Sequence, residues 1–267
     1  MVRPVAVVGN LSRDLVDEGP PRAGGAPFHA ARALRVLGRP ALLGAKCADG
    51  DRDSLLIPLV RLGLPVLWRG GSSTAAFSFH YEGDRRVMTV DALGDPWTTA
   101  DLHGLERTDW VHVGALARSD FPAETLAALA RDRRVSFDGQ GLVRPARTGP
   151  LELDGDYDPE VLRHVSILKL AEEEAEALVG EPDEDALRSL GVPEVVLTQG
   201  SRGSLVLADG KLAQVPAQAV GGETDPTGAG DAFSAAYLVS RSTGHAPTAA
   251  ARRATALVAG LLGRRVK

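Results

Sequence analysis

Short apolar runs alternate with longer helix-like patterns along almost the whole of this 267-residue chain. Strands buried on both faces are predicted at residues 5–8, 41–43, 110–113, 135–137, 166–168 and 195–197. Helices are predicted at residues 27–37, 54–62, 123–130, 172–178 and 184–190, and glycine directly follows several of them. This alternation is typical of a parallel sheet covered by helices on both sides, and the chain is long enough to bury a large core.

One segment breaks this alternation with a period of two. Within residues 74–90, Phe77, Phe79 and Tyr81 alternate with small or polar side chains, and a turn is predicted at Glu82-Gly83-Asp84. The pattern predicts an antiparallel hairpin. A hairpin alone is marginally stable in water, so it must lie on the core, on a substrate or on a second subunit. A lid over a binding site and an ordinary edge hairpin both fit the pattern.

Neither a linker nor an internal repeat divides the sequence. We therefore expect a single domain spanning residues 1–267, with a lid excursion over approximately residues 11–24 and 66–96. Residues 145–158 are rich in proline, glycine and acidic side chains, and they are predicted to form a loop.

Charge and cysteine usage narrow the function classes. The formal net charge of -5 argues against a general nucleic-acid binder, which needs a concentrated basic stripe. Cys47 is the single cysteine, so neither an intrachain disulfide nor a cysteine metal cluster is expected. The apolar runs at residues 5–8 and 254–262 are too short for a signal peptide or a membrane span. We expect a soluble, cytoplasmic protein with no nucleic-acid or membrane partner.

The segment from Asp225 to Asp231 reads Asp-Pro-Thr-Gly-Ala-Gly-Asp and precedes a strong helix pattern that starts at Asp231. Proline stops any preceding helix, and the two glycines leave the backbone uncovered. The predicted structure is a glycine loop whose amides point outward from a helix N-terminus, which carries roughly half a positive charge and binds anions. At a transferring phosphoryl group, these amides would stabilise charge without reorganising.

Asp231 has two explanations from the residues alone. An aspartate in the first helical turn is a favoured cap, and it is also suited to take the proton of an attacking hydroxyl. Other glycine-loop motifs do not fit: the sequence lacks G-x-x-x-x-G-K-[ST], and Phe233 stands where a dinucleotide fingerprint needs glycine. The sequence also lacks a G-x-S-x-G elbow and an H-E-x-x-H pair.

The run from Asp225 to Asp231, with the following Ala232-Phe233, resembles the D-T-x-G-A-G-D signature of the PfkB carbohydrate kinases. The resemblance implies a ribokinase-like three-layer α/β/α sandwich with a mostly parallel central sheet and a small β lid. It implies transfer of a phosphoryl group from ATP, with Mg²⁺, to a hydroxyl of a small sugar or polyol. It favours Asp231 as general base, and it assigns the anion-binding amides to Gly228, Ala229 and Gly230.

The resemblance extends over nearly the whole chain. Asp14, after the first strand, resembles the family's sugar-binding aspartate, and Gly24-Gly25 resembles its diglycine turn beside the substrate. Residues 168–174 resemble the N-x-x-E segment, in which Glu174 would help to organise magnesium. Residues 198–203 match a T-x-G-x-x-G turn that contacts nucleotide phosphates. The donor-binding residues implied in this way are Lys169, Thr198, Gly200, Gly203, Asp225 and Thr227.

Three departures from the family pattern bear on function. His29 stands where the family has a substrate-binding asparagine, and it is expected either to bind the substrate or to be a core histidine. Ala171 replaces the asparagine of N-x-x-E, so metal binding is expected to be weaker or arranged differently. The sequence ends at Lys267 without the family's glycine-containing tail, which leaves the nucleotide site and a monovalent-cation site open.

Several alternatives remain open from the sequence. A nucleoside kinase of the same fold would need an apolar pocket wall, for which Phe28 and Trp68 are candidates. A sensor that binds sugar or nucleotide without turnover is favoured by Ala171 and opposed by Asp231. Resemblance to inositol kinases around Gln140 and Arg144 is faint, and a plain loop is the preferred interpretation there. The apolar lid face is also a candidate contact for a homodimer.

Overall fold

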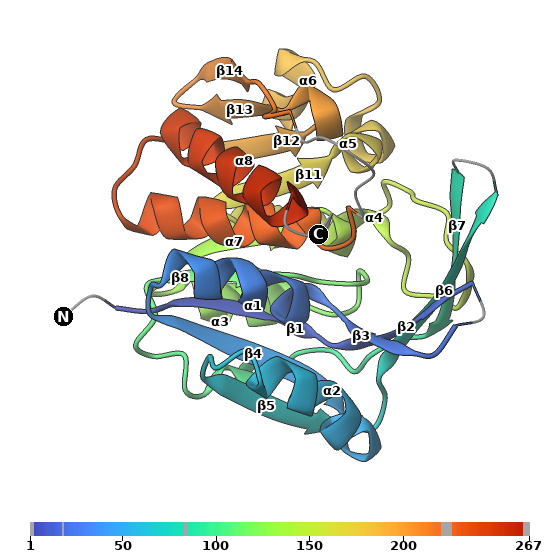
Figure 1. Cartoon of the computed structure of the whole chain (residues 1–267). Coiled ribbons are helices and arrows are strands. Elements are labelled where there is room, and N and C mark those ends of the chain that lie inside the picture. The colour runs from blue at the N-terminus through green and yellow to red at the C-terminus, as the bar shows by residue number, and fades with distance from the viewer. Residues whose placement is uncertain (1–2, 18, 83–84, 220–225, 264–267) are drawn as a thin grey trace.

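A nine-stranded sheet forms the centre of this computed structural model, which describes residues 3–17, 19–82, 85–219 and 226–263 (Figure 1). The strand order is β14-β13-β12-β11-β9-β8-β1-β4-β5. Neighbours from β12 to β5 pair in parallel, whereas β13 and β14 join antiparallel at one edge. The strands are β1 (Val5–Asn10), β4 (Ala41–Ala48), β5 (Val66–Gly71), β8 (Trp110–Val113), β9 (Arg134–Asp138), β11 (Ile167–Ala171), β12 (Glu194–Thr198), β13 (Ser204–Ala208) and β14 (Lys211–Val215).

The six predicted strands are all present, with ends shifted by a few residues. In the central strand β1 every residue is buried, which is the pattern of a parallel strand covered on both faces. The pairing of β1 with β4 on one side and β8 on the other places β1 inside the sheet, third from the edge strand β5.

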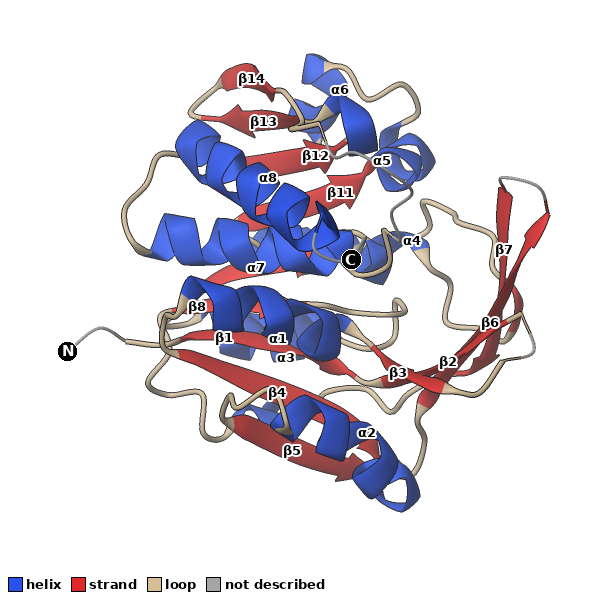
Figure 2. Cartoon of the chain, in the orientation of Figure 1, coloured by secondary structure: helices blue, strands red, loops and turns tan. Residues whose placement is uncertain are grey.

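Helices cover both faces of the central sheet (Figure 2). One layer contains α1 (Ala26–Leu37), α2 (Arg52–Val60), α7 (Ala229–Ser242) and α8 (Pro247–Gly263), whose apolar faces pack on the strands. The other layer contains α3 (Ala123–Ala130), α5 (Glu172–Val179) and α6 (Glu184–Ser189). The predicted three-layer sandwich and its five predicted helices are thus confirmed.

A second, five-stranded sheet forms the lid, in the order β10-β7-β6-β2-β3. Its strands are β2 (Ser12–Val16), β3 (Arg22–Gly24), β6 (Ala75–Glu82), β7 (Arg85–Ala92) and β10 (Gly149–Pro150). β6 and β7 pair antiparallel, which confirms the predicted hairpin, while the predicted turn at Gly83 and Asp84 lies outside the described residues. Figure 1 shows the lid standing at one end of the central sheet.

Two features of the lid correct the sequence-based expectations. β5 belongs to the central sheet, where it pairs with β4, so the excursion starts after Gly71 and not at residue 66. Part of the predicted loop at residues 145–158 is the strand β10, which pairs with β7 and therefore ties the lid to the segment after β9. A two-residue strand that contains proline has no alternating pattern, so its sequence could not reveal it.

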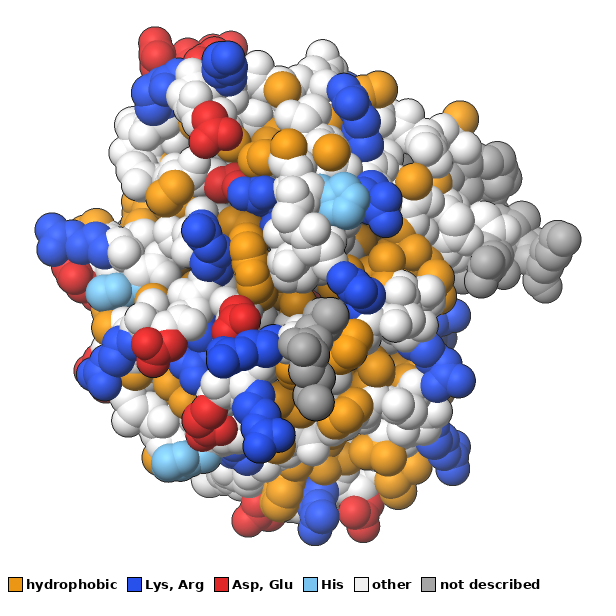
Figure 3. All heavy atoms as spheres, turned by 90° about the vertical axis from the view of Figure 1, so that its left-hand side faces the viewer, with side chains coloured by type: hydrophobic (Ala, Val, Ile, Leu, Met, Phe, Trp, Pro, Cys, Tyr) orange, Lys and Arg blue, Asp and Glu red, His pale blue; other side chains and the backbone are white. Residues whose placement is uncertain are grey.

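The apolar side of the lid faces inward. Phe77 and Phe79 are 4% and 6% exposed within the single chain, so neither ring offers the predicted apolar face to a second lid. On the opposite end of the protein, basic and acidic side chains are interspersed over the surface (Figure 3). Among the described residues, every helix is too short or too polar to serve as a membrane span.

Candidate active site

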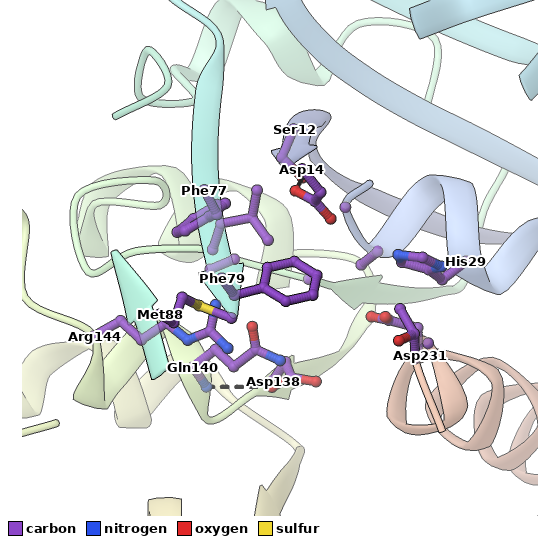
Figure 4. Close-up of a pocket in the computed structure, with 17 residues that line it drawn as sticks. Ser12, Asp14, His29, Phe77, Phe79, Met88, Asp138, Gln140, Arg144 and Asp231 are labelled. Atoms are coloured by element: carbon purple, nitrogen blue, oxygen red, sulfur yellow. Dashed lines mark hydrogen bonds between the residues drawn. The ribbon is translucent and has the colours of Figure 1, made fainter. Parts of the chain in front are cut away.

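A pocket lies where the carboxyl ends of the central strands meet the inner face of the lid (Figure 4). Its free volume is about 120 Å³. The carboxyl ends of parallel strands are the usual place for ligand sites in α/β folds. The polar lining consists of Ser12, Asp14, His29, Asp138, Gln140, Arg144, Thr227 and Asp231, and Phe77, Phe79 and Met88 form an apolar wall from the lid.

Asp231 lies in the first turn of α7 and borders this pocket. α7 begins at Ala229, two residues before the predicted start, because Gly228 adopts a left-handed φ of 75° as N-cap. Burial raises the pKa of Asp231 to about 7; the Asp138 carboxylate adds to the rise, while Lys169 and Arg144 oppose it. A carboxylate with a pKa near neutrality can accept a proton and release it at the same pH.

Within the glycine loop, the amide of Ala229 donates a hydrogen bond to another residue of the loop. Ala229 N donates to the Pro226 carbonyl at 2.9 Å, and Ala232 N donates to the Gly228 carbonyl at 3.0 Å, which closes the first helical turn. Of the three amides predicted to bind an anion, that of Ala229 is therefore already engaged within the loop.

A buried charge cluster lies beneath the glycine loop. Lys169 Nζ lies 3.5 Å from Asp138 Oδ2 and 3.9 Å from Glu174 Oε2. A β-carbon at Gly230 would lie 3.4 Å from the same nitrogen. Burial alone would lower the pKa of Lys169, but the carboxylates of Asp138, Glu174 and Asp231 outweigh it and raise that pKa. Lys169 is therefore a fixed positive charge close to the base candidate.

Glu174 is the residue predicted to contact magnesium. Its Oε2 accepts a hydrogen bond from Ala171 N at 2.7 Å, and among the described residues its Oε1 has no polar partner. The described chain brings together no group of three or more His, Cys, Asp or Glu side chains that would hold a metal. Magnesium at phosphate sites takes most ligands from phosphates and water and only one or two carboxylates. The single Oε1 of Glu174 fits an ion that arrives with a phosphate donor.

The predicted substrate residues Asp14, Gly25 and His29 all border the pocket, and Gly24 lies against Asp14. Ser12 Oγ donates to Asp14 Oδ1 at 2.7 Å, and a β-carbon at Gly24 would lie 2.2 Å from Asp14 Oδ2. At Gly25, φ is 93° and a β-carbon would lie 2.2 Å from the Asn10 carbonyl. Gly25 therefore requires glycine for α1 to approach β1, and a side chain at Gly24 in β3 would displace Asp14 of the neighbouring strand β2.

His29 lies between two cavities. It borders the pocket under the lid and also a smaller cavity lined by Arg32 of α1 and by Val258 and Leu261 of α8. Thr227 and Gly228 border both cavities as well. The N-terminus of α7 thus faces two adjoining spaces, which is the geometry that a group passing between two bound molecules requires.

The predicted donor residues divide into two groups. Thr227 lines the pocket and Lys169 lies beneath the glycine loop, as described above. Thr198, Gly200 and Gly203 form a separate turn after β12, at the same sheet edge, where Thr198 is paired with Ala171. Gly200 and Gly203 have φ of 55° and 101°, so the turn needs both glycines. Asp225 lies outside the described residues.

The structure adds pocket residues that the sequence did not assign. Asp138 ends β9, and the following helix α4 (Gln140–Val143) replaces the predicted plain loop, so that Gln140 and Arg144 reach the pocket. Gln140 N donates to Asp138 Oδ1 at 3.2 Å. The sequence signals were the polar residues Asp138 and Gln140 directly after a predicted strand and the faint resemblance to inositol kinases there. The suggested apolar residues Phe28 and Trp68 are not among the described residues that line the pocket; the lid supplies that wall.

Comparisons with known proteins agree on one family. Residues 12–263 match the model of the pfkB family carbohydrate kinases. A fructokinase of Rhizobium leguminosarum bv. trifolii is 30% identical in an alignment over 257 residues that covers 88% of this chain and 77% of that protein. A ribokinase of Bacillus subtilis (strain 168) is 30% identical over 172 residues, which are 64% of this chain and 56% of that protein.

A solved structure resembles the chain over almost its full length. It is a pyrophosphate-dependent kinase in the ribokinase family, complexed with a pyrophosphate analog and myo-inositol. Its TM-score is 0.84 at 26% sequence identity, and the match covers 97% of this chain and 94% of that chain.

Proposed function

Because this chain belongs to the pfkB family of carbohydrate kinases, we propose that it transfers a phosphoryl group to a hydroxyl of a small sugar or polyol, with Asp231 as the general base. The family membership makes the protein a small-molecule kinase. The roles of individual residues, the donor and the acceptor are the proposal.

One observation carries the proposal. Asp231, whose pKa is raised to about 7, shares a single pocket with Asp14 and lies in the first turn of α7 beside Gly228. An aspartate needed only as a helix cap gains nothing from a buried position that disfavours its charge. A base that must take up and release a proton near neutral pH gains from that position.

The chemical step follows from these positions. An acceptor hydroxyl held by Asp14 and the Gly24-Gly25 turn faces Asp231, which takes the hydroxyl proton as the oxygen attacks the terminal phosphoryl group. The new P–O bond forms as the donor's phosphoanhydride bond breaks, and the donor leaves with that bridging oxygen. The amides of Gly228 and Gly230, at the positive end of α7, stabilise charge on the moving group. Positioning and electrostatics supply most of the acceleration, because the transition state is loose.

Magnesium would enter with the donor and neutralise charge on its phosphates. Glu174 is the protein residue proposed to hold it, through Oε1. Lys169 keeps positive charge beneath the loop whether or not the donor is bound, because its partners Asp138 and Glu174 are also buried.

ATP is the proposed donor, and pyrophosphate is a specific second candidate. The resemblance to PfkB kinases favours ATP, with Thr198, Gly200 and Gly203 at its phosphates. The 26% identical structure described above is that of a pyrophosphate-dependent kinase. Both donors present a terminal phosphoryl group on a phosphoanhydride, so the same loop at Gly228–Gly230 would serve either.

A neutral sugar or polyol is the acceptor that the pocket favours. Asp14, Asp138 and Asp231 offer hydrogen-bond acceptors to hydroxyl groups, and the wall of Phe77, Phe79 and Met88 suits the C–H face of a ring. A nucleoside could use the same wall, and it remains the alternative acceptor class. A sensor without turnover would have no use for the position of Asp231.

The experiment is an activity screen with two donors. Purified protein is incubated with Mg-ATP or Mg-pyrophosphate and a panel of myo-inositol, D-fructose, D-ribose and cytidine, and phosphorylated product is measured by mass spectrometry. Product from a sugar or polyol supports the proposal. Product from cytidine alone supports the nucleoside alternative, and ligand binding without any product supports the sensor.

A further inference from the structure

A layer of buried polar side chains lies between α7 and the central sheet, next to the pocket. His112, Ser136 and Asp138 project from the sheet and Ser234 from α7, and each is at most 3% exposed. The step proposed above uses neither His112 nor Ser234. Buried polar groups cost free energy unless they are hydrogen-bonded, so their presence under the base needs an explanation.

The three side chains of the sheet lie on one face. His112 in β8 is paired with Ser136 in β9, and its Nδ1 lies 3.1 Å from Ser136 Oγ. Asp138 follows Ser136 by two residues, so it projects to the same face. Asp138 is in turn paired with Lys169, whose Nζ would lie 3.4 Å from a β-carbon at Gly230 of α7. This face of the sheet is therefore the one that α7 covers.

Ser234 lies on the side of α7 that faces this layer. It follows Asp231 by three residues and precedes Arg241 by seven, which is the spacing of one helix face. The Arg241 guanidinium carbon lies 6.0 Å from the centre of the Trp110 ring in β8, and Asp231 borders the pocket (Figure 4). His112 lies two residues after Trp110 in β8, on the way to the pocket. Ser234 thus faces the sheet at the level of His112.

Three atoms of this layer are inaccessible to solvent and have no hydrogen-bond partner among the described residues. They are His112 Nε2, Ser234 Oγ and Asp138 Oδ2. Asp138 Oδ2 does approach Lys169 Nζ, but their separation of 3.5 Å is long for a hydrogen bond. A serine in a helix can donate to the carbonyl one turn before it, and Ser234 does not. The three atoms, from β8, α7 and β9, therefore require a further partner.

A single water molecule has the donors and acceptors that these three atoms need. A buried water typically makes about three hydrogen bonds to otherwise unsatisfied groups, since it can donate two and accept two. It would donate to the Asp138 carboxylate and accept from the Ser234 hydroxyl. Burial lowers the pKa of His112 to about 4, while Asp138 opposes this fall and Lys169 adds to it, so the ring is neutral. A neutral ring can accept from the water or donate to it through Nε2.

The far end of α7 is tied to the sheet by direct polar contacts, whereas the end with the base is not. Tyr237 Oη donates to Glu194 Oε1 at 2.5 Å, and Arg241 forms an ion pair with Glu194 Oε2 at 2.9 Å. Within the described part of the chain, α7 side chains before Tyr237 make no hydrogen bond to the sheet. A water held at Ser234 would supply that attachment one turn away from Asp231.

We propose that a buried water molecule binds His112 Nε2, Ser234 Oγ and Asp138 Oδ2 and fixes the first turns of α7 on β8 and β9. His112 and Ser234 are then positioning residues. They touch neither the acceptor nor the phosphoryl group, and they set the distance between Asp231 and the carboxylate of Asp138. The water site does not depend on the proposed function, but its effect on turnover rests on that function.

A crystal structure that resolves ordered water tests the site directly. We expect the wild type to show one water within hydrogen-bond distance of all three atoms. Ser234→Ala should lose this water, because one of its partners is removed. A direct hydrogen bond between Ser234 and His112, or no water in the space between them, would overturn the proposal.

Urea unfolding of single and double variants tests whether His112 and Ser234 share a partner. Side chains that hold one water are coupled, so His112→Phe should cost less stability in the Ser234→Ala background than in the wild type. His112→Val takes its place if the phenylalanine variant does not fold. Additive costs of the two substitutions would contradict a shared water.

The matched control for this unfolding cycle is Ser240→Ala. Ser240 is also buried in α7, and its Oγ is not one of the unpartnered atoms. The cost of Ser240→Ala should add to that of His112→Phe.

Steady-state kinetics test the positioning role. With the best acceptor of the panel, we expect Ser234→Ala to lower kcat about tenfold, because a small displacement of a catalytic group causes losses of this order. The KM values of donor and acceptor should stay within about threefold of wild type, and Ser240→Ala should keep the wild-type kcat. A wild-type kcat in a Ser234→Ala protein that has lost the water would end the positioning role.

Two of these measurements use no substrate, which separates the inference from the proposed function. If the wild type gives no product with any donor and acceptor of the panel, the proposed function fails. The water site is then still decided by the crystal structure and by the unfolding cycle.

Discussion

The ring of His29 packs directly on the backbone of Gly228. A β-carbon at Gly228 would lie 2.6 Å from His29 Nδ1, and φ at this glycine is 75°. The contact joins the first turn of α1 to the N-cap of α7, so it brings α1 against the loop proposed to stabilise charge on the phosphoryl group. We infer from this contact that His29 helps to position the glycine loop.

We predict that Gly228→Ala lowers kcat, because the added methyl group causes crowding as well as backbone strain. The left-handed conformation alone costs an alanine about 1 kcal/mol, and the clash with His29 must displace the loop. We expect kcat to fall at least about tenfold, measured with the best acceptor of the panel.

The matched control is Gly244→Ala. Gly244 has a φ of 85° but nothing within 4 Å of the added β-carbon. Gly244→Ala should lose only the roughly 1 kcal/mol of backbone strain in a denaturant titration and keep full activity. Equal loss of kcat in the two variants would contradict the claim that the His29 contact positions the loop.

The pKa of Asp231 predicts the acid limb of the rate profile. The base must be deprotonated, and burial raises its pKa to about 7. We therefore expect kcat/KM to increase roughly tenfold per pH unit below pH 7 and to level off above it. Asp138, Asp14, Lys169 and Arg144 also act on this pKa, so the limb reports on the whole cluster. A flat profile between pH 5 and 8 would contradict the assignment.

Removing the charge of Lys169 should move this limb. The ammonium lowers the pKa of Asp231, so Lys169→Met should shift the acid limb to higher pH. It should also destabilise the fold by about 3–5 kcal/mol, because it leaves buried carboxylates unpaired.

Lys169→Arg, which keeps the charge, should leave the limb in place, and Lys211→Met at an exposed site should change neither property. Urea denaturation and the pH profile are measured on each variant. An unshifted limb in a folded Lys169→Met protein would show that Lys169 does not act on Asp231.

Asp120 is buried outside the pocket, and we predict that its ionisation makes the stability of the fold depend on pH. It is 1% exposed, its Oδ2 accepts from Leu116 N at 2.8 Å, and burial raises its pKa to about 7. Because the folded-state pKa lies above the unfolded value near 3.8, the protonated form favours folding, and this contribution is lost as the pH rises through 7.

We expect Asp120→Asn to be more stable than wild type at pH 8, by about 4 kcal/mol, and the difference to vanish below pH 4. Thermal unfolding from pH 4 to 8 measures it, with Asp132→Asn at an exposed site as control. A difference that is the same at every pH would mean that the ionisation of Asp120 is not its source.

Much of the fold followed from local sequence patterns, and much of the site did not. β1 begins with four apolar residues and is buried on both faces, so its type could be predicted from its residues. The loop before α7 could be predicted because proline restricts the backbone and glycine permits conformations that other residues avoid. The start of α7 was predicted two residues late, because Gly230 is a poor helix former. The αL conformation of Gly228 sets the actual start at Ala229.

The charge cluster around Lys169 and the position of Arg144 in the pocket both depend on long-range strand pairing. Lys169 was assigned to the donor from its neighbours in sequence, yet its contacts Asp138 and Glu174 come together because β9 and β11 are adjacent and parallel. Arg144 reaches the pocket because α4 is only four residues long and β10 then turns to the lid. Neither pairing leaves a periodic pattern in the sequence.

The central claim, that Asp231 is the base of a kinase, is tested most directly by single-turnover product formation with wild type and Asp231→Asn. Both proteins are mixed with Mg-ATP or Mg-pyrophosphate and the best acceptor of the panel, at saturating concentrations. We predict a rate about a hundred- to ten-thousandfold lower in the variant, with donor affinity unchanged by calorimetry. A variant that forms product at the wild-type rate would contradict the account.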